Sequence, residues 1–139
     1  MKDVEFEALL VTTLDDICWL TNLRGTDIDC NPVFFSYMLF YPKRGADETR
    51  TILFTDESKV ASIQDYLTSQ KIEVRPYDKI TEQLAEYASS GVKVGVSDAS
   101  CNAELNRICG DSVVVAENTI KNTKAAKNPT EMAGMRNSN

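Results

Sequence analysis

The sequence predicts an α/β domain built on a mixed β-sheet with helices on its faces. From residue 56 onward, helical patterns alternate with short apolar runs, which is typical of strands joined by helical crossovers in a largely parallel region. Before that point, the aromatic run VFFSYMLFY, a polar turn and the run TILF form the pattern of an antiparallel hairpin. The 139 residues, of which 42% are apolar, are enough to bury one hydrophobic core.

The first predicted elements are a strand and a short helix. The apolar run 8–12 is consistent with a strand buried on both faces. A helix then begins near residue 14, with Thr13 or Asp15 available as its cap. The side chains expected on its buried side are Ile17, Leu20 and, as a further candidate, Trp19.

A polar loop and the hairpin follow. Residues 24–32 form a loop that ends in an Asn-Pro pair, which disfavours continued regular structure. The dense aromatic content of residues 33–41 favours a strand. Residues 42–48 make the turn, and residues 51–54 return as the second strand of the hairpin.

Three helices then alternate with three strands. Asp56 begins the first helix, Asp78 caps the second, which ends at residues 89–91, and the third begins near Asp98 or Ser100. The strands are expected at residues 72–74, 92–96 and 113–115. The side chains expected to face the core are Val60, Ile63 and Leu67 in the first helix, Ile80, Leu84 and Ala88 in the second, and Cys101, Leu105 and Ile108 in the third.

Charge and hydropathy exclude several classes of partner. The net charge of −6 is diffuse, and nucleic-acid binding is disfavoured because phosphate contacts need clustered basic residues. No apolar run is long enough to span a membrane. The acidic start of the chain does not resemble a signal peptide, so a cytoplasmic location is expected. The four cysteines (Cys18, Cys30, Cys101 and Cys109) lack metal-binding spacing and are interpreted as free thiols in a reducing compartment.

The chain contains no histidine, and this bears most directly on catalysis. Most acid–base chemistry near neutral pH, most activated nucleophiles and most metal sites use imidazole. Asp15 and Asp16 are adjacent, so on a helix they point about 100° apart and are poorly placed to share a metal ion. The two glycines of the sequence GVKVG lie on either side of a predicted strand. A phosphate-binding loop instead places its glycines between a strand and a helix, so this segment is not one. We expect no catalytic residues, no metal site and no cofactor in this chain.

Two segments remain without an assigned role. The loop from Arg24 to Pro32 carries an arginine, two aspartates and an asparagine beside apolar elements, where a binding role and a plain solvated loop are both open. The tail NPTEMAGMRNSN has the marks of a helix start, with Asn128 as cap, Pro129 at the first position and Glu131 completing a capping box. So short a helix is marginal in water unless another part of a protein packs on it.

The stretch from Leu14 to Tyr41 closely resembles a signature of cytosolic Xaa-Pro aminopeptidases, or aminopeptidase P. That signature has the form L-D-[DE]-I-A-W-L-x-N-L-R-G-[ST]-D-[IV]-x-x-N-P-V-F-F-S-Y, and Cys18 replaces its alanine. Residues 55–59 are similar to the family's D-x-S-K segment. Residues 127–136 resemble its K-N-x-x-E-x-x-G-M-R segment, and this chain has Asn139 where the family usually has histidine. The matched positions include Trp19, Asn22, Arg24, Gly25, Asp27, Asn31 and Pro32.

The resemblance implies a domain of a larger enzyme. Residues 1–120 would be the middle, creatinase/prolidase N-terminal-like domain, and residues 121–139 a linker and the start of the first helix of a catalytic domain with the pita-bread fold. That catalytic domain binds two Mn²⁺ ions through two aspartates, a histidine and two glutamates, which would lie beyond residue 139. The expectation is that the chain is truncated at both ends and inactive alone.

In that context the resemblance implies a noncatalytic accessory role near the substrate. The domain would shape access for peptides with proline at the second position and the pocket for their N-terminal residue. The substrate-proximal candidates are Asp16, Trp19, Arg24, Asp27 and Asn31, with a carboxylate attracting the peptide's α-ammonium and Arg24 holding Asp27 or a substrate carbonyl. The expected partner is the catalytic domain of the same polypeptide, and a homodimer of the parent enzyme stays open. The alternative is a stand-alone protein-interaction module with the same fold.

Overall fold

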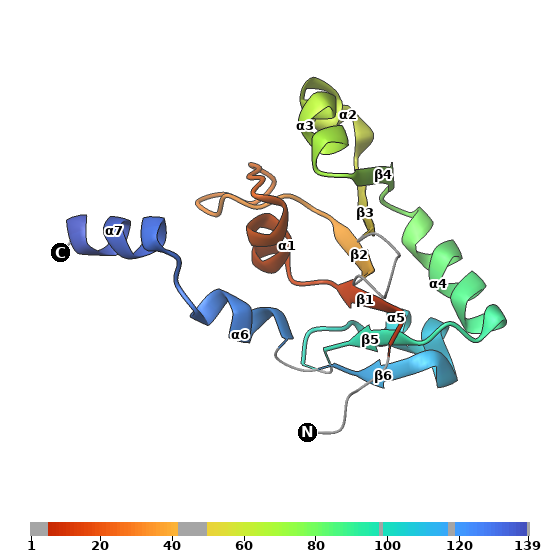
Figure 1. Cartoon of the computed structure of the whole chain (residues 1–139). Helices are drawn as coiled ribbons and strands as arrows, with labels where there is room; N and C mark the ends of the chain where they lie inside the picture. The colour runs from red at the N-terminus through yellow and green to blue at the C-terminus, as the bar shows by residue number, and fades with distance from the viewer. Residues whose placement is uncertain (1–5, 42–49, 98, 117–118, 139) are drawn as a thin grey trace.

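A mixed sheet of six strands, in the order β4-β3-β2-β1-β5-β6, organises the chain (Figure 1). The computed structural model describes residues 6–41, 50–97, 99–116 and 119–138. The strands are β1 (Ala8–Val11), β2 (Tyr37–Tyr41), β3 (Arg50–Thr55), β4 (Ile72–Pro76), β5 (Val94–Val96) and β6 (Val113–Val115). The α/β class and the mixed sheet predicted from the sequence are confirmed.

The sheet combines an antiparallel centre with parallel flanks. β2 runs antiparallel to both β1 and β3, with Leu10 opposite Leu39 and Leu39 opposite Ile52. β4 lies parallel to β3, while β5 and β6 continue parallel to β1 on the other side. The predicted hairpin is therefore β2–β3, and its predicted turn at residues 42–48 falls outside the described residues.

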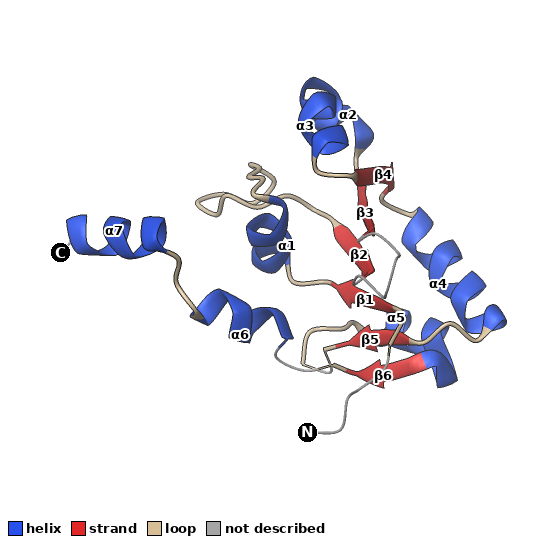
Figure 2. Cartoon of the chain, in the orientation of Figure 1, coloured by secondary structure: helices blue, strands red, loops and turns tan. Residues whose placement is uncertain are grey.

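Helices cover the two faces of this sheet, as Figure 2 shows. α1 (Leu14–Thr21) and α6 (Thr119–Ala125) lie on one side, and α4 (Lys79–Ser90) and α5 (Ala103–Cys109) lie on the other. α2 (Glu57–Val60) and α3 (Gln64–Ser69) follow β3, and α7 (Pro129–Asn137) projects at the C-terminal end. Single 3₁₀ turns at Ala61–Ile63 and Gly110–Ser112 complete the described elements.

The core has two layers because side chains alternate along each strand. Toward α4 and α5, Leu39 and Phe54 pack with Leu84, and all three are fully buried. Toward α1, Met38 and Leu53 pack with Ile17. Every residue of β1 is buried, which confirms the prediction of a strand covered on both faces.

The predicted strand 33–41 is wrong in its first four residues, because β2 begins only at Tyr37. Side chains form hydrogen bonds with both the backbone N–H and the backbone carbonyl oxygen of Phe35. Its N–H donates to Asp27 Oδ2 at 2.8 Å, and its carbonyl oxygen accepts from Thr55 Oγ1 at 2.9 Å. These bonds satisfy the backbone without a sheet ladder, and the side chain of Phe35 is left 50% exposed.

The predicted first helix of the alternating region is interrupted. Asp56 caps it as expected, accepting from the Ser58 N–H at 3.0 Å, and Val60 and Leu67 are buried. Val60 and Ile63 leave the α-helical conformation, with φ of −104° and −121°, and a 3₁₀ turn lies between α2 and α3. Both residues are β-branched, which restricts their side chains in a helix.

The third helix begins later than predicted. Asn102, whose Oδ1 accepts from the Leu105 N–H at 2.9 Å, is its cap rather than Ser100, and Asp98 lies outside the described residues. Cys101 therefore precedes the helix and is half-buried, whereas Leu105 is buried as predicted.

Several other residues that were predicted to face the core are only partly buried. Leu20, expected in the core, is 38% exposed because it lines a groove between α1 and α3 together with Phe40 and Tyr66. Ile63, Ala88, Ile108 and Trp19 are half-buried. All four cysteines are free thiols, and burial raises the pKa of Cys109 to about 11.

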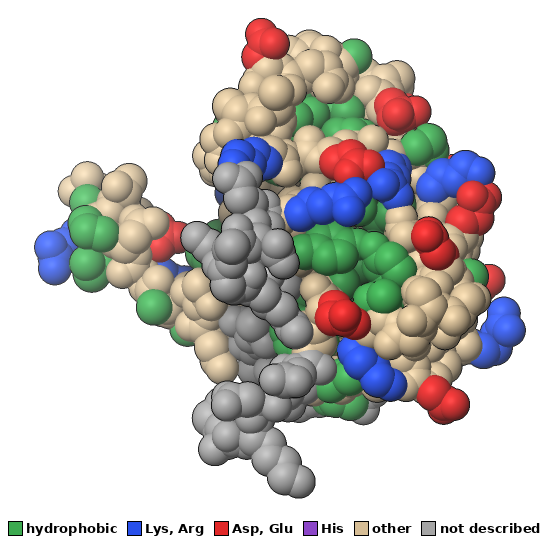
Figure 3. Space-filling view, turned by 45° about the vertical axis from the view of Figure 1, so that its right-hand side comes forward, with side chains coloured by type: hydrophobic (Ala, Val, Ile, Leu, Met, Phe, Trp, Pro, Cys, Tyr) green, Lys and Arg blue, Asp and Glu red, His purple; other side chains and the backbone are tan. Residues whose placement is uncertain are grey.

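The charges on the surface are interspersed. On the face shown in Figure 3, basic and acidic side chains alternate around a group of hydrophobic side chains, and no broad basic area is seen there. Glu73 on the edge strand β4 illustrates the pattern, because it pairs with Arg50 at 2.7 Å and with Arg75 at 2.6 Å.

Leu84→Ala tests the core between α4 and the sheet. Leu84 is fully buried, so its truncation should lower the free energy of unfolding in urea by about 2–5 kcal/mol. Leu20→Ala, at a leucine that is 38% exposed, is the control and should cost less than half as much. Equal losses for the two variants would contradict the packing described above.

Candidate functional site

The candidate site lies where α1 ends and the polar loop of residues 24–32 begins. α1 is anchored by Ile17, which is fully buried, so that Asp15 and Trp19 lie toward its outer side. Asn22 ends the helix in the left-handed conformation, with φ of 53°, and its N–H donates to the Trp19 carbonyl at 3.4 Å. The chain thereby turns back toward α1 as it enters the loop.

Arg24 fastens this loop to the helix. Its Nη1 donates to the carbonyl oxygens of Cys18 and Leu23, each at 2.8 Å. The hypothesis that Arg24 holds Asp27 is not met, because Asp27 instead accepts from Lys59 Nζ at 2.6 Å and from the Phe35 N–H. The bond from Lys59, followed by the one from Phe35, lowers the pKa of Asp27. Lys59 therefore links α2 to the loop.

Gly25 permits the close approach of the loop to the segment before β2. A Cβ atom at this position would lie 2.6 Å from Cβ of Phe34 and 3.0 Å from the carbonyl oxygen of Val33. Further along, the Asn31 N–H donates to the Ile28 carbonyl at 3.1 Å, and Cys30 takes a positive φ of 60° in the turn between them. The loop is thus tied to itself and to the core by specific contacts.

A cavity of about 240 Å³ collects several of the predicted residues. Its lining comprises Asp15, Cys18, Trp19, Arg24, Asn31, Pro32, Val33 and Lys124. Three of the five substrate-proximal candidates, Trp19, Arg24 and Asn31, therefore meet at one place.

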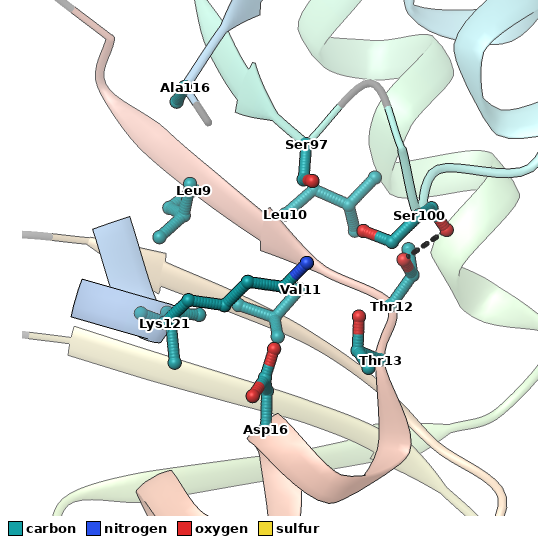
Figure 4. A pocket seen from close by; sticks show the side chains of 11 residues that line it. Leu9, Leu10, Val11, Thr12, Thr13, Asp16, Ser97, Ser100, Ala116 and Lys121 are labelled. Carbon is teal, nitrogen blue, oxygen red and sulfur yellow. Dashed lines mark hydrogen bonds between the residues drawn. The ribbon is translucent and has the colours of Figure 1, made fainter. Parts of the chain in front are cut away.

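The other two candidates lie elsewhere. Asp27 lines a neighbouring cavity of about 370 Å³ that also touches Arg24 and Lys59. Asp16 is buried and lines a small cavity of about 30 Å³ at the end of β1 (Figure 4).

Lys124, which the sequence analysis did not single out, neutralises the acidic start of α1. Its Nζ lies 2.6 Å from Asp16 Oδ1 and 2.9 Å from Asp15 Oδ2. The hydrogen bond from Lys124 is the main cause that lowers the pKa of Asp15. The two adjacent carboxylates thus share an ammonium group, and α6 is held on α1. No sequence pattern points to a pair separated by 108 residues.

The tail is joined to the same place. The predicted capping box of α7 is confirmed, because Asn128 Oδ1 accepts from the Glu131 N–H and Glu131 Oε2 accepts from the Asn128 N–H, each at 2.9 Å. The other carboxylate oxygen of Glu131 accepts from Trp19 Nε1 at 3.5 Å. The Asn128 N–H first, and then Trp19, lower the pKa of Glu131. The first turn of α7 therefore contacts a predicted site residue.

The described residues contain no group of three or more histidine, cysteine, aspartate or glutamate side chains placed to hold a metal ion. Among the helices in those same ranges, none has the length and apolar character needed to cross a membrane.

The fold and the matched sequence define the class of this domain. The profile of the creatinase/prolidase N-terminal domain matches residues 1–131, and the chain belongs to this family. Its fold also resembles the N-terminal domain of a cytoplasmic peptidase from Mycobacterium tuberculosis, with a TM-score of 0.52 and 17% identity, over 84% of this chain and 85% of that one.

Xaa-Pro aminopeptidases are its relatives within that class. Xaa-Pro aminopeptidase 1 of Dictyostelium discoideum is 34% identical over 99% of this chain and 21% of its own length. A putative Xaa-Pro aminopeptidase of Saccharomyces cerevisiae is 49% identical over 58% of this chain and 10% of its own length. The X-prolyl aminopeptidase of Caenorhabditis elegans, described as a cytosolic enzyme with a di-nuclear active site, superposes with a TM-score of 0.82. It is 26% identical over 96% of this chain and 22% of its own. The chain therefore spans at most about a fifth of these relatives.

Gly25→Ala tests the close approach of the loop. The added methyl group would lie 2.6 Å from Cβ of Phe34, so the variant should lose about 1–3 kcal/mol of unfolding free energy through overpacking. Gly134→Ala in α7 is the control, because a Cβ there meets nothing within 4 Å. A Gly25→Ala variant as stable as the Gly134→Ala variant would argue against a fixed loop.

Lys124→Met tests the attachment of α6 to α1. Removing the ammonium group leaves the buried Asp16 carboxylate without its ion pair, which should cost about 1–3 kcal/mol. Trp19, the single tryptophan, reports the change by fluorescence, and its quenching by acrylamide should increase. Lys127→Met removes a neighbouring charge as the control. Unaltered quenching and stability in Lys124→Met would show that the ion pairs do not hold α6.

Proposed function

We propose that this chain is the noncatalytic accessory domain of a dimanganese Xaa-Pro aminopeptidase that acts in the cytoplasm. In this role, α1 and the loop from Arg24 to Pro32 line the approach to the catalytic cleft. They limit entry to peptides with proline at the second position and help to shape the pocket for the N-terminal residue. The catalytic domain of the same polypeptide is the partner, and it supplies both metal ions and all metal ligands.

The contact between Trp19 and Glu131 carries this proposal. Glu131 lies in the first turn of α7, which we assign to the first helix of the catalytic domain, and its carboxylate accepts from the Trp19 indole at 3.5 Å. Trp19 in turn lines the cavity of about 240 Å³ with Arg24 and Asn31. A segment leading into the catalytic domain would thus lie beside the predicted substrate-proximal residues.

The chemistry of the cavity suits the proposed task. Arg24 donates hydrogen bonds to backbone carbonyl oxygens through one nitrogen, Nη1. Its remaining N–H groups are suited to bind a peptide carbonyl. Asp15 and Asp16 share Lys124, so their negative charge is partly neutralised before a peptide arrives. We therefore assign recognition of the peptide backbone to Arg24 and the apolar wall to Trp19.

The kinetic test uses the full-length parent enzyme. Arg24→Met should lower kcat/KM for an Xaa-Pro peptide about tenfold, because an interaction worth about 1.4 kcal/mol in the transition state is lost. Arg107→Met, an exposed residue of α5 on the other side of the sheet, is the control and should leave the kinetics unchanged. Thermal unfolding of both variants separates lost folding from lost binding. If a well-folded Arg24→Met enzyme has the same kcat/KM as the unaltered enzyme, the proposed role of Arg24 is overturned.

The isolated chain provides a second measurement. Incubated with Mn²⁺ and Xaa-Pro peptides, it should show no hydrolysis, because the proposed metal ligands lie in another domain. Turnover by this chain alone would overturn the accessory role.

A further inference from the structure

The first part of the polar loop is bound to the segment that precedes β2 by backbone hydrogen bonds. The Gly25 N–H donates to the Pro32 carbonyl at 3.4 Å, and the Asp27 N–H donates to the Val33 carbonyl at 3.1 Å. Arg24 is the residue immediately before the first of these bonds, so its backbone belongs to the same short strip. A shift of Asp27 therefore also displaces Arg24.

Asp27 ends this strip and uses both oxygen atoms of its carboxylate. Oδ2 accepts from the Phe35 N–H at 2.8 Å, and Oδ1 accepts from Lys59 Nζ at 2.6 Å. The Asp27 side chain is only 12% exposed. A carboxylate with so little access to water depends on its protein donors, because a charge removed from water without a partner is unfavourable. Lys59 is therefore one of two groups that fix the position of Asp27.

Lys59 is itself held in place by α2. Asp56 caps this helix, and its Oδ1 accepts from the N–H of Ser58 at 3.0 Å and from the hydroxyl group of Ser58 at 2.7 Å. Val60, the next residue after Lys59, is buried in the core. Because α2 is anchored on both sides of Lys59, the ammonium group is tied to the scaffold, and Asp27 takes its position from it.

Lys59 and Arg24 line the same cavity of about 370 Å³, together with Asp27 and apolar side chains such as Phe34 and Val60. Arg24 also lines the cavity of about 240 Å³, so its position sets the boundary between the two. Lys59 and Arg24 are both cations and repel each other. Lys59 can therefore hold Arg24 in place only through Asp27 and the backbone of the loop.

We propose that Lys59 is a positioning residue for peptide recognition, which acts through Asp27 to fix the loop that carries Arg24. This inference rests on the proposed function, in which Arg24 binds the peptide backbone. Lys59 contacts no peptide. It preorganises the guanidinium group of Arg24, so that peptide binding need not supply the free energy to order the loop.

An ordinary surface ion pair provides the comparison. Lys79 and Glu82 are also 2.6 Å apart, but both are exposed and both belong to α4. Such a pair contributes little, because water screens it and it joins no separate parts of the fold. The pair of Lys59 and Asp27, in contrast, joins residues that are 32 positions apart. Lys79→Met is therefore the matched control for Lys59→Met.

A double-mutant cycle in the full-length parent enzyme tests the proposal. Lys59→Met should lower kcat/KM for an Xaa-Pro peptide about threefold, and Lys59→Arg, which keeps the positive charge, should restore most of the loss. In an enzyme that already carries Arg24→Met, Lys59→Met should lower kcat/KM less than about 1.5-fold, because no guanidinium group is left to position. Lys79→Met should leave kcat/KM unchanged.

Amide hydrogen exchange in this chain measures the positioning directly. In Lys59→Met, exchange should accelerate at least about fivefold at Asp27 and Phe35, whose N–H groups lie at the end of the strip. Exchange in β1 should stay unchanged, which shows that the fold is retained. Lys79→Met should alter neither.

The outcomes separate this inference from the proposed function. If Arg24→Met lowers kcat/KM and Lys59→Met does not, the positioning role is overturned while the role of Arg24 stands. The same conclusion follows if Lys59→Met has equal effects with and without Arg24, if Lys59→Arg is as slow as Lys59→Met, or if exchange at Phe35 is unchanged. If Arg24→Met itself has no effect, the role of Arg24 fails, and the positioning role fails with it.

Discussion

The burial of β1 on both faces is the constraint on which the rest of the structure depends. All four of its residues are buried, between an antiparallel neighbour, β2, and a parallel one, β5. A strand so enclosed cannot shift by one residue without exchanging its two sets of apolar side chains. Its end therefore fixes where α1 begins, and α1 fixes the positions of Trp19 and the loop that follows.

Side-chain contacts, several of them between residues distant in sequence, then assemble the candidate site on this frame. Lys124 joins α6 to the start of α1, and Glu131 joins α7 to Trp19. Arg24 and Lys59 hold the polar loop from two sides, one through α1 and the other through α2. None of these polar contacts is part of the hydrophobic packing of the core, but together they determine which side chains line the cavities. This is the expected division between a packed scaffold and the loops it carries.

The elements that were predicted correctly are those whose signal is local. The apolar run of β1, the capping box at Asn128 and the helical face of Leu84 depend on neighbours a few residues away. The failure at residues 33–36 depends on side chains outside that segment. Aromatic residues at 33–36 favour a strand, yet Asp27 and Thr55 occupy the backbone of Phe35. Likewise, the resemblance named Trp19, Arg24 and Asn31 as candidates, and they line one cavity, whereas no pattern in the sequence predicts that Lys124 lies beside them.

The two side-chain bonds to Phe35 have a mechanical consequence. Asp27 binds the N–H of Phe35 and also Lys59 of α2, while Thr55 at the end of β3 binds the carbonyl. The loop, the entry to β2 and the start of α2 are thereby clasped at a single residue. A displacement of the loop at Asp27 would therefore strain contacts with two strands and a helix at once.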